Sequence, residues 1–146
     1  MKKVLMIGGT GIISMAITRL AVKRDWEVYL LNRGTRSNEL PEGVNVINVD
    51  INDEAAAAAK LDGMFFDVVC DFIGFVPAQL ERDYRLFNGK TRQFMYISSA
   101  SAYHKPVALY VIDEGTTLAN PYWQYSRDKI ACEEYLMKMY REMASR

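Results

Sequence analysis

Tyr125 and Lys129 are the pair of residues whose types and spacing point most directly to acid–base chemistry. Residues four apart share a helix face, so the lysine ammonium would lie one turn from the phenol. A nearby positive charge favours the phenolate and lowers a tyrosine pKa from its usual value of about 10. A chain with nine tyrosines contains such a pair by chance about half the time, so the position of the pair must decide its meaning.

A cluster of serines precedes this pair in the chain. Ser98, Ser99 and Ser101 follow a short apolar run, and the pair opens the helical pattern that comes next. In a parallel sheet the end of a strand and the start of the following helix lie at the carboxyl edge, where α/β proteins bind their ligands. The serines and the Tyr–Lys pair are therefore expected at the same edge.

A glycine-rich segment, Gly8-Gly9-Thr10-Gly11, lies between the first apolar run and the first helical pattern. Gly8 permits a tight turn, and Gly11 lets the backbone approach a diphosphate. The amides that open the helix supply hydrogen-bond donors and the positive end of its dipole. Ser14 stands where a third glycine usually permits close helix packing, and its side chain is small enough to fit. The segment predicts a dinucleotide site.

The end of the second apolar run is where such a fold meets the adenosine ribose. An acidic residue there would repel a 2′-phosphate, but the chain has Asn32 and Arg33, with Arg36 close behind. A guanidinium can pair with that phosphate, so NADP(H) is favoured over NAD(H), although both arginines could simply be solvated in a turn. Asp50, after the third run, could accept from the adenine amino group or serve as a turn residue or helix cap.

Five short apolar runs rich in valine and isoleucine alternate with helical patterns, which indicates a parallel sheet covered on both faces. We expect an α/β, three-layer, doubly wound Rossmann-type sheet of about five strands in the order 3-2-1-4-5. The expected strands are residues 3–7, 27–31, 44–49, 66–72 and 92–98, and three of the expected helices are 53–61, 77–87 and 122–143. A further helix joins the first two strands, with apolar residues at helical spacing from Ile13 to Ala21 and with Lys23 and Arg24 near its C-terminal end. Residues 103–121 are expected to form a long loop, with Tyr122 and Trp123 packing it onto the last helix.

Length and composition set further bounds. The 146 residues suffice for one domain, 50% are apolar, and 18 basic residues balance 18 acidic ones. A neutral chain has no field to gather RNA or an anionic membrane, which disfavours a general nucleic-acid binder. Cys70 and Cys132 are far apart and predict neither a disulfide nor a metal site. No apolar run is long enough to span a membrane, and we expect a soluble, cytoplasmic protein.

Taken in order, the glycine motif, Asp50, the serine cluster through Tyr103, and Tyr125-x-x-x-Lys129 resemble the N-terminal part of an extended short-chain dehydrogenase/reductase of the NAD(P)-dependent epimerase/dehydratase family. The resemblance covers nearly the whole chain. It implies that Tyr125 is the general acid/base, that Lys129 binds the nicotinamide ribose, and that Ser99 hydrogen-bonds the reacting oxygen. Ser98 and Ser101 are the alternatives to Ser99, which lies four residues before Tyr103 as in the family.

The resemblance also implies the cofactor, its site and the reaction. The expected chemistry is hydride transfer between a sugar-type carbon and the nicotinamide of NADP or NAD, with a nucleotide sugar as a possible substrate and no metal. The expected cofactor-binding residues are Gly8, Thr10, Gly11, Ile12, Ile13, Asn32, Arg33, Asp50, Ile51, Ile73, Gly74 and Ser98.

Two features depart from the family pattern. The fourth run ends in Asp71-Phe72-Ile73-Gly74-Phe75, as in an atypical branch that includes chloroplast stem-loop RNA-binding proteins. The chain also stops before the substrate domain of extended members, so we expect residues 1–146 to form a Rossmann domain that is inactive alone. A homodimer through the long helices is expected, with Met137, Tyr140 and Met143 in its interface. A non-catalytic dinucleotide-binding module and an RNA-binding relative are the alternatives to an enzyme.

Overall fold

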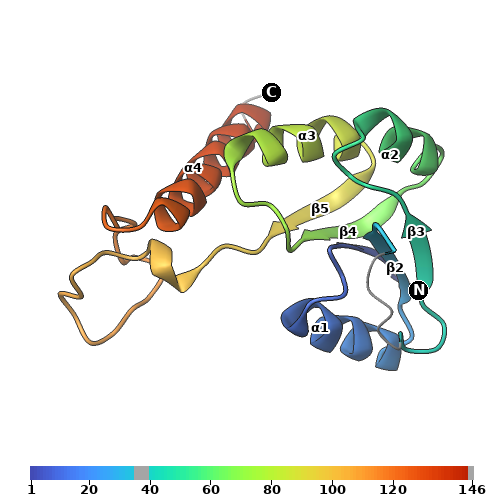
Figure 1. Ribbon diagram of the computed structural model, residues 1–146, viewed down its shortest axis with the longest axis horizontal. Coiled ribbons are helices and arrows are strands. Elements are labelled where there is room, and N and C mark those ends of the chain that lie inside the picture. The colour runs from blue at the N-terminus through green and yellow to red at the C-terminus, as the bar shows by residue number, and fades with distance from the viewer. Residues whose placement is uncertain (35–39, 145–146) are drawn as a thin grey trace. The chain divides into compact units, whose positions relative to one another are not determined.

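The computed structural model describes residues 1–34 and 40–144 (Figure 1). In chain order its elements are β1 (Lys3–Ile7), α1 (Ile12–Lys23), β2 (Glu27–Asn32), β3 (Asn45–Asn48), α2 (Glu54–Lys60), β4 (Phe66–Asp71), α3 (Pro77–Phe87), β5 (Thr91–Tyr96), the 3-10 turn η1 (Ala100–Ala102) and α4 (Gln124–Ala144). The chain divides into two compact units. Unit 1 comprises Met1–Ile73 and Arg82–Ile97, and unit 2 comprises Gly74–Glu81 and Ser98–Arg146.

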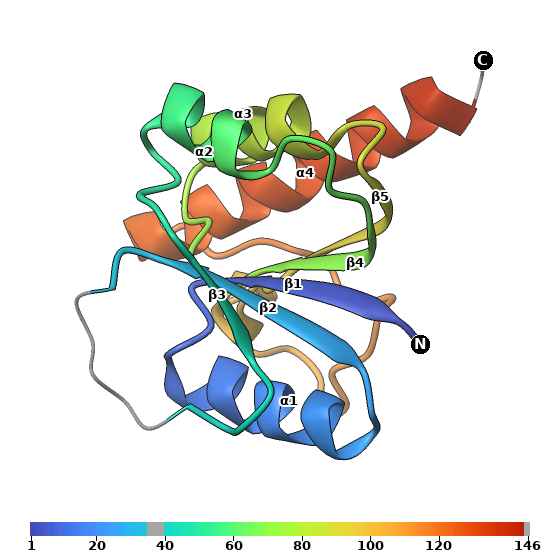
Figure 2. The ribbon, with the colours of Figure 1, turned by 90° about the vertical axis from the view of Figure 1, so that its right-hand side faces the viewer.

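Unit 1 is built on a five-stranded parallel sheet in the order β3-β2-β1-β4-β5. β1 lies in the middle, with Val4 paired to Val28 of β2 on one side and to Val68 of β4 on the other. Helix α1 covers one face of the sheet, and α2 covers the opposite face (Figure 2). The predicted fold class and strand order are therefore confirmed.

The two faces of β1 explain why its sequence is apolar without interruption. Val4 and Met6 pack on the α1 side, whereas Leu5 and Ile7 pack on the side of α2 and the second half of α3. Alternate residues of a strand point to opposite faces, so a strand covered on both faces needs apolar residues at every position. Cys70 of β4 belongs to the α1-side core, and burial raises the pKa of its thiol to about 11, as expected for an unreactive packed thiol.

Local signals locate the helix ends well. Asp53, where the predicted helix begins, caps α2 by accepting a hydrogen bond from the Ala56 amide at 3.1 Å. Pro77 opens α3 as predicted. The predicted bounds of two other elements were wrong by two residues. β5 ends at Tyr96 rather than at residue 98. α4 begins at Gln124 rather than at residue 122, because the carbonyl of Trp123 accepts the first hydrogen bonds from amides of the helix.

Unit 2 contains α4, the 3-10 turn and the predicted long loop. Residues 103–121 have no helix and no extended strand, and the loop is closed by a bridge between Tyr103 and Leu118 and by the His104 amide donating to the Thr117 carbonyl at 2.9 Å. On α4, Met137, Tyr140 and Met143 are at least half exposed, and the expected homodimer stays a prediction. Within the described ranges, no helix has both the length and the apolar character needed to span a bilayer.

Candidate functional site

The glycine loop of unit 1 has two positions at which its own packing requires glycine. Gly8 has a φ of +78°, and a Cβ there would lie 2.3 Å from Cγ2 of Ile73. A Cβ on Gly9 would lie 2.4 Å from Cδ2 of Leu30. The turn after β1 is thus pressed against the end of β4 on one side and against β2 on the other.

Ser14 takes the place of the third glycine and closes the loop with its hydroxyl. The Gly11 amide donates to Ser14 Oγ at 2.9 Å, and the Oγ atom lies 3.1 Å from the Gly8 carbonyl, which can accept its proton. The side chain is 1% exposed. The small residue expected at this position therefore fits, and it also ties the two ends of the turn together.

Gly11 differs from the other two glycines because the chain's own packing does not require it. Its φ is −80°, and a Cβ there would meet only Ser14 Oγ, at an ordinary contact distance of 3.4 Å. It caps the twelve-residue helix α1, whose first side chains, Ile12 and Ile13, are 95% and 64% exposed. An open helix N-terminus without a side chain at its cap fits the approach of a diphosphate.

The end of β2 carries the residues predicted to read the adenosine ribose. Asn32 Oδ1 accepts a hydrogen bond from the Gly34 amide at 2.9 Å, which folds the backbone into a turn after the strand. Arg33 is exposed in this turn, with its side chain available to an anion. Arg36 lies outside the described residues.

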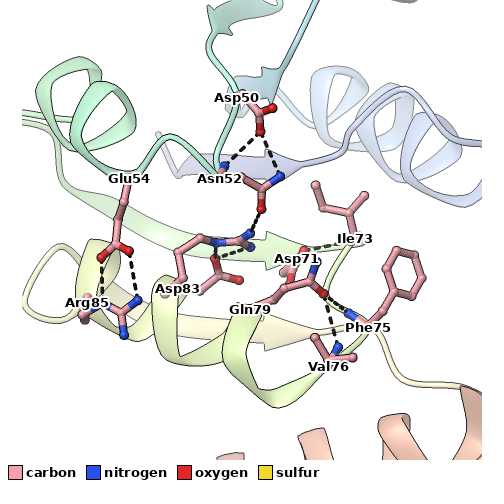
Figure 3. A network of polar contacts seen from close by, with 11 residues as sticks. Asp50, Asn52, Glu54, Asp71, Ile73, Phe75, Val76, Gln79, Asp83 and Arg85 are labelled. Atoms are coloured by element: carbon pink, nitrogen blue, oxygen red, sulfur yellow. Dashed lines mark hydrogen bonds and ion pairs between the residues drawn. The ribbon is translucent and has the colours of Figure 1, made fainter.

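Asp50, the predicted adenine acceptor, follows β3 and belongs to a polar network (Figure 3). Its Oδ1 accepts from the amide of Asn52 at 2.9 Å and from Asn52 Nδ2 at 3.0 Å. Asn52 Oδ1 in turn accepts from Nη1 of Arg82 on α3 at 2.7 Å. Ile51, another predicted contact, is 2% exposed and packs in the core.

Two buried carboxyl groups extend this network and were missed in the sequence. Asp83 accepts from Nε of Arg82 at 2.9 Å, and Asp71 Oδ1 accepts from the Ile73 amide at 2.8 Å. Both aspartates are fully buried. Burial, with the Asp71 carboxylate adding to it and Arg82 opposing it, raises the pKa of Asp83 to about 8. The only signal in the sequence was an aspartate at the end of an apolar strand.

In unit 2, α4 places Tyr125 in its first turn and Lys129 in the next, on one face as the spacing predicted. Lys129 Nζ lies 5.7 Å from the centre of the Tyr125 ring and donates to the Gly74 carbonyl at 2.7 Å. Although it is a lysine, it is only 2% exposed. It also lies 5.0 Å from the centre of the Phe75 ring, so the atypical turn after β4 supplies two of its contacts.

Aromatic rings flank Tyr125 on α4. The Trp123 ring centre is 4.7 Å from that of Tyr125, and the Phe75 ring centre is 6.3 Å from it. Trp123 is 56% exposed, and Tyr122 is 75% exposed. The ring of Trp123, which precedes α4, is tilted by 38° against that of Tyr125 on the helix, and this agrees with the expectation that Trp123 packs the end of the loop against the helix. Tyr122 is mostly exposed.

The serines of the cluster form two separate sets of hydrogen bonds. Ser98 Oγ donates to Glu133 of α4. Ser99 Oγ and Ser101 Oγ lie 2.9 Å apart, and Ser126 Oγ donates to Ser101 Oγ at 3.0 Å. Because Ser126 follows Tyr125 in the chain, this second set of hydrogen bonds links Ser99 to the start of α4.

Comparisons with known proteins agree with this geometry. The family model described as the NAD dependent epimerase/dehydratase family matches residues 4–146. The structure is similar to the UDP-Glc/GlcNAc 4-epimerase of Campylobacter jejuni, with a TM-score of 0.81 and 20% identity over 94% of this chain and 49% of that one. No curated protein matches the chain.

Two further structures are solved with a nucleotide. The UDP-glucose 4-epimerase of Bifidobacterium longum, in complex with NAD+ and UDP, has a TM-score of 0.78 and 19% identity over 96% of this chain and 49% of that one. WbmG of Bordetella bronchiseptica, in complex with NAD, has a TM-score of 0.73 and 16% identity over 94% and 49%. The chain spans about half the length of the structures that it matches, and the likeness at these identities concerns the fold. With the family model matching nearly its whole length, the chain belongs to the NAD dependent epimerase/dehydratase family.

Proposed function

We propose that this chain binds a nicotinamide adenine dinucleotide and carries the acid–base residues of an epimerase, dehydratase or reductase that acts on a sugar-type hydroxyl or ketone. Its membership of the family supports the dinucleotide. The observation that carries the catalytic part is the buried Lys129, held by the Gly74 carbonyl at 2.7 Å with its ammonium 5.7 Å from the Tyr125 ring. A nucleotide sugar is the proposed substrate, because one structural neighbour is solved with both NAD+ and UDP.

Unit 1 supplies the proposed contacts with the adenosine diphosphate part of the cofactor. The amides at the start of α1 would bind the diphosphate, Asp50 would accept from the adenine amino group, and Arg33 would pair with a 2′-phosphate. The expected contacts from Thr10 and Ile73 would come from the same loop and from the end of β4. The absence of an acidic residue at the end of β2 supports NADP over NAD, whereas the solved neighbours hold NAD.

In the proposed reaction, one proton is transferred to and from the Tyr125 oxygen. When bound, the nicotinamide would accept or return a hydride at its C4. The Tyr125 oxygen would take the proton of the reacting hydroxyl and return it in the reverse direction. Lys129 is buried, and the Gly74 carbonyl and the Phe75 ring stabilise its ammonium group. It would in turn stabilise the phenolate and bind the nicotinamide ribose. Ser99 would donate to the reacting oxygen.

Calorimetric titration with NADPH and NADH tests the cofactor half of this proposal. We expect tighter binding of NADPH, and we expect Arg33→Ala to weaken NADPH binding about tenfold or more while leaving NADH binding unchanged, because a charge-assisted pair with the 2′-phosphate is lost. Arg92→Ala is the matched control, since Arg92 is an exposed arginine at the opposite, amino-terminal end of a strand of the same sheet. Equal affinity for both would contradict the NADP preference, and no binding of either would contradict the dinucleotide site.

Substitution of the tyrosine tests the catalytic half. In a protein that joins this chain to a substrate domain of the family, an assay can follow oxidation of UDP-glucose or UDP-galactose by the absorbance of the reduced dinucleotide. Tyr125→Phe is expected to lower that rate at least about a hundredfold, because the proton has no acceptor. Cofactor affinity should change little. Tyr122→Phe, three residues earlier and 75% exposed, is the control and should leave the rate unchanged. An active Tyr125→Phe variant would remove Tyr125 from the proposed mechanism.

A further inference from the structure

A buried arginine on α3 donates a hydrogen bond to a side chain in the segment that follows β3. Arg82 is only 6% exposed, and Asp83 accepts from its Nε at 2.9 Å and lies 2.7 Å from its Nη2. These contacts with Asp83 fix the guanidinium and direct Nη1 at Asn52 Oδ1, 2.7 Å away and thirty residues earlier in the chain. A bond from a charged donor is short and strong, so Arg82 is well suited to orient the amide.

The orientation of the Asn52 amide follows from its two neighbours. Its oxygen must face Arg82, because a guanidinium has donors and no acceptor. The side-chain nitrogen of Asn52 therefore faces Asp50. Nδ2 donates to Asp50 Oδ1 at 3.0 Å, and the main-chain N–H of Asn52 donates to the same oxygen at 2.9 Å. The reversed amide would set a donor against Arg82 and an oxygen against a carboxylate, so Arg82 selects the state in which Asn52 is a donor to Asp50.

The hydrogen bonds from Asn52 occupy one carboxylate oxygen of Asp50 and leave the other oxygen for a ligand. Oδ1 accepts two hydrogen bonds from Asn52. Within the ranges that the structure describes, Oδ2 has no hydrogen-bond partner, and the residue is partly exposed. A carboxylate held in one rotamer with one acceptor oxygen directed outward can recognise a single N–H group with little loss of entropy on binding.

The anchor of the network is buried at the end of β4. Asp71 Oδ1 accepts from the Ile73 amide at 2.8 Å, and it lies close enough to Asp83 to raise the pKa of that carboxyl (Figure 3). Ile73 in turn lies against Gly8. The network therefore links the adenine side of the predicted cofactor site, after β3, to the glycine turn after β1.

We propose that Asn52 and Arg82 are positioning residues that orient Asp50 to accept the 6-amino group of adenine, so that this network determines the base specificity of the cofactor site. The inference rests on the proposed function, in which Asp50 faces the adenine ring. Neither residue would touch the cofactor. Both would act through the carboxylate of Asp50.

A pair of cofactors that differ at this position, and in a hydrogen on the adjacent N1, tests the proposal. Nicotinamide hypoxanthine dinucleotide carries a carbonyl oxygen where NAD+ carries the amino group, so an oriented carboxylate would attract one and repel the other. Calorimetry gives the ratio of their dissociation constants. Because both constants are measured on the same protein sample, a reduced fraction of folded protein affects both equally and does not change the ratio. We expect the unsubstituted chain to prefer NAD+ about tenfold or more, because a buried acceptor without a donor is costly.

Substitutions at the two positioning residues should abolish the preference. Asn52→Ala replaces an exposed side chain and should fold, and the ratio should fall to within about twofold of unity. Asn52→Asp can still accept from Arg82 but cannot donate to Asp50, so it should lose the preference equally. Arg82→Met should do the same. Arg85→Met is the matched control, because Arg85 lies on the same helix and pairs with Glu54 at 2.7 Å.

The outcomes separate this inference from the proposed function. A wild-type preference for NAD+ that persists in Asn52→Ala and Asn52→Asp would overturn the positioning role while leaving the dinucleotide site in place. Equal binding of both dinucleotides by the unsubstituted chain would also overturn it. Failure of the unsubstituted chain to bind NAD+, NADPH or the hypoxanthine dinucleotide would overturn the proposed function, and this inference with it.

Discussion

At the scale of single residues, the glycines of the loop after β1 serve different purposes. Gly8 and Gly9 are required by the protein's own atoms, because any side chain would collide with Ile73 or Leu30. A Cβ on Gly11 would collide with nothing, so the packing of the described residues does not explain this glycine. The proposed approach of a diphosphate would explain it, and mutation can separate the two kinds of position.

Gly8→Ala is expected to be among the most destabilising alanine substitutions in unit 1. Alanine at a φ of +78° costs about 1 kcal/mol, and the contact of its Cβ with Ile73 at 2.3 Å should add about 1–3 kcal/mol. Gly63→Ala is the matched control, with a φ of +66° and no atom within 4 Å of its Cβ, and should show the backbone cost alone. Urea denaturation gives both free energies of unfolding, and equal losses would contradict the predicted contact.

The buried Asp83 predicts a pH dependence of stability. Its pKa is raised from the usual 3.8 to about 8, so the folded protein holds a proton that the unfolded chain releases above pH 4. The contribution of Asp83 to stability is therefore full at low pH and falls as the pH rises toward 8, by up to about 1.4 kcal/mol per pH unit. Asp71 and Arg82 are the charged groups that face it.

Asp83→Asn should remove this dependence, because an amide resembles the protonated carboxyl and does not titrate. We expect the melting temperature of the unsubstituted chain to fall between pH 6 and pH 8.5 by clearly more than that of the variant. Asp62→Asn, at an exposed aspartate, should behave like the unsubstituted chain. Parallel curves for the chain and for Asp83→Asn would show that Asp83 is ionised throughout this range.

At the scale of elements, α1 shows how one helix both closes the glycine loop and packs on the sheet. Its buried residues are Ser14, Met15, Thr18 and Ala21. Ser14 bonds to the loop, whereas the equally buried Thr18 hydroxyl has no hydrogen-bond partner in the described part of the chain. Two buried hydroxyls on the same helix face therefore have opposite energetic consequences.

Ser14→Ala should destabilise the protein, because the partly buried Gly11 amide loses its acceptor, at a cost of about 1 kcal/mol. Thr18→Val has the same shape and removes a hydroxyl without a partner, so its stability should be unchanged or increased. Chemical denaturation of both variants measures the difference. A Thr18→Val variant that loses as much stability as Ser14→Ala would contradict these roles.

At the scale of the whole molecule, the balance of charge bears on the choice between an enzyme and an RNA-binding relative. The chain has 18 basic and 18 acidic residues. Affinity for a nucleic acid depends on neutralising several phosphates with clustered cations, and a neutral surface gains little from this term. The fourth-strand turn that resembles the RNA-binding branch contributes Gly74 and Phe75 to the Lys129 site instead.

We therefore expect no shift of a stem-loop RNA by this chain in a gel mobility assay at about 0.15 M salt, at protein concentrations that saturate dinucleotide binding. Lowering the salt should produce at most weak binding without preference for the stem-loop over an unrelated duplex. A tight shift specific to the stem-loop that weakens steeply with salt would favour the RNA-binding alternative.

Much of the fold was determined by local sequence. Strand and helix periodicity, the glycine turn, the Asp53 cap and the spacing of Tyr125 and Lys129 depend on residues within a few positions of each other, where side-chain direction follows directly from backbone geometry. These features could be predicted without knowledge of the folded chain.

Tertiary structure alone decided which polar groups meet. Asn52 and Arg82 are thirty residues apart, Ser98 and Glu133 thirty-five, and Gly74 and Lys129 fifty-five, and nothing in their local sequence marks them as partners. Asp71 and Asp83 look like ordinary aspartates until folding removes both from water and changes the pKa of one of them. Such groups acquire their properties from desolvation and from neighbours that only the packed chain brings together.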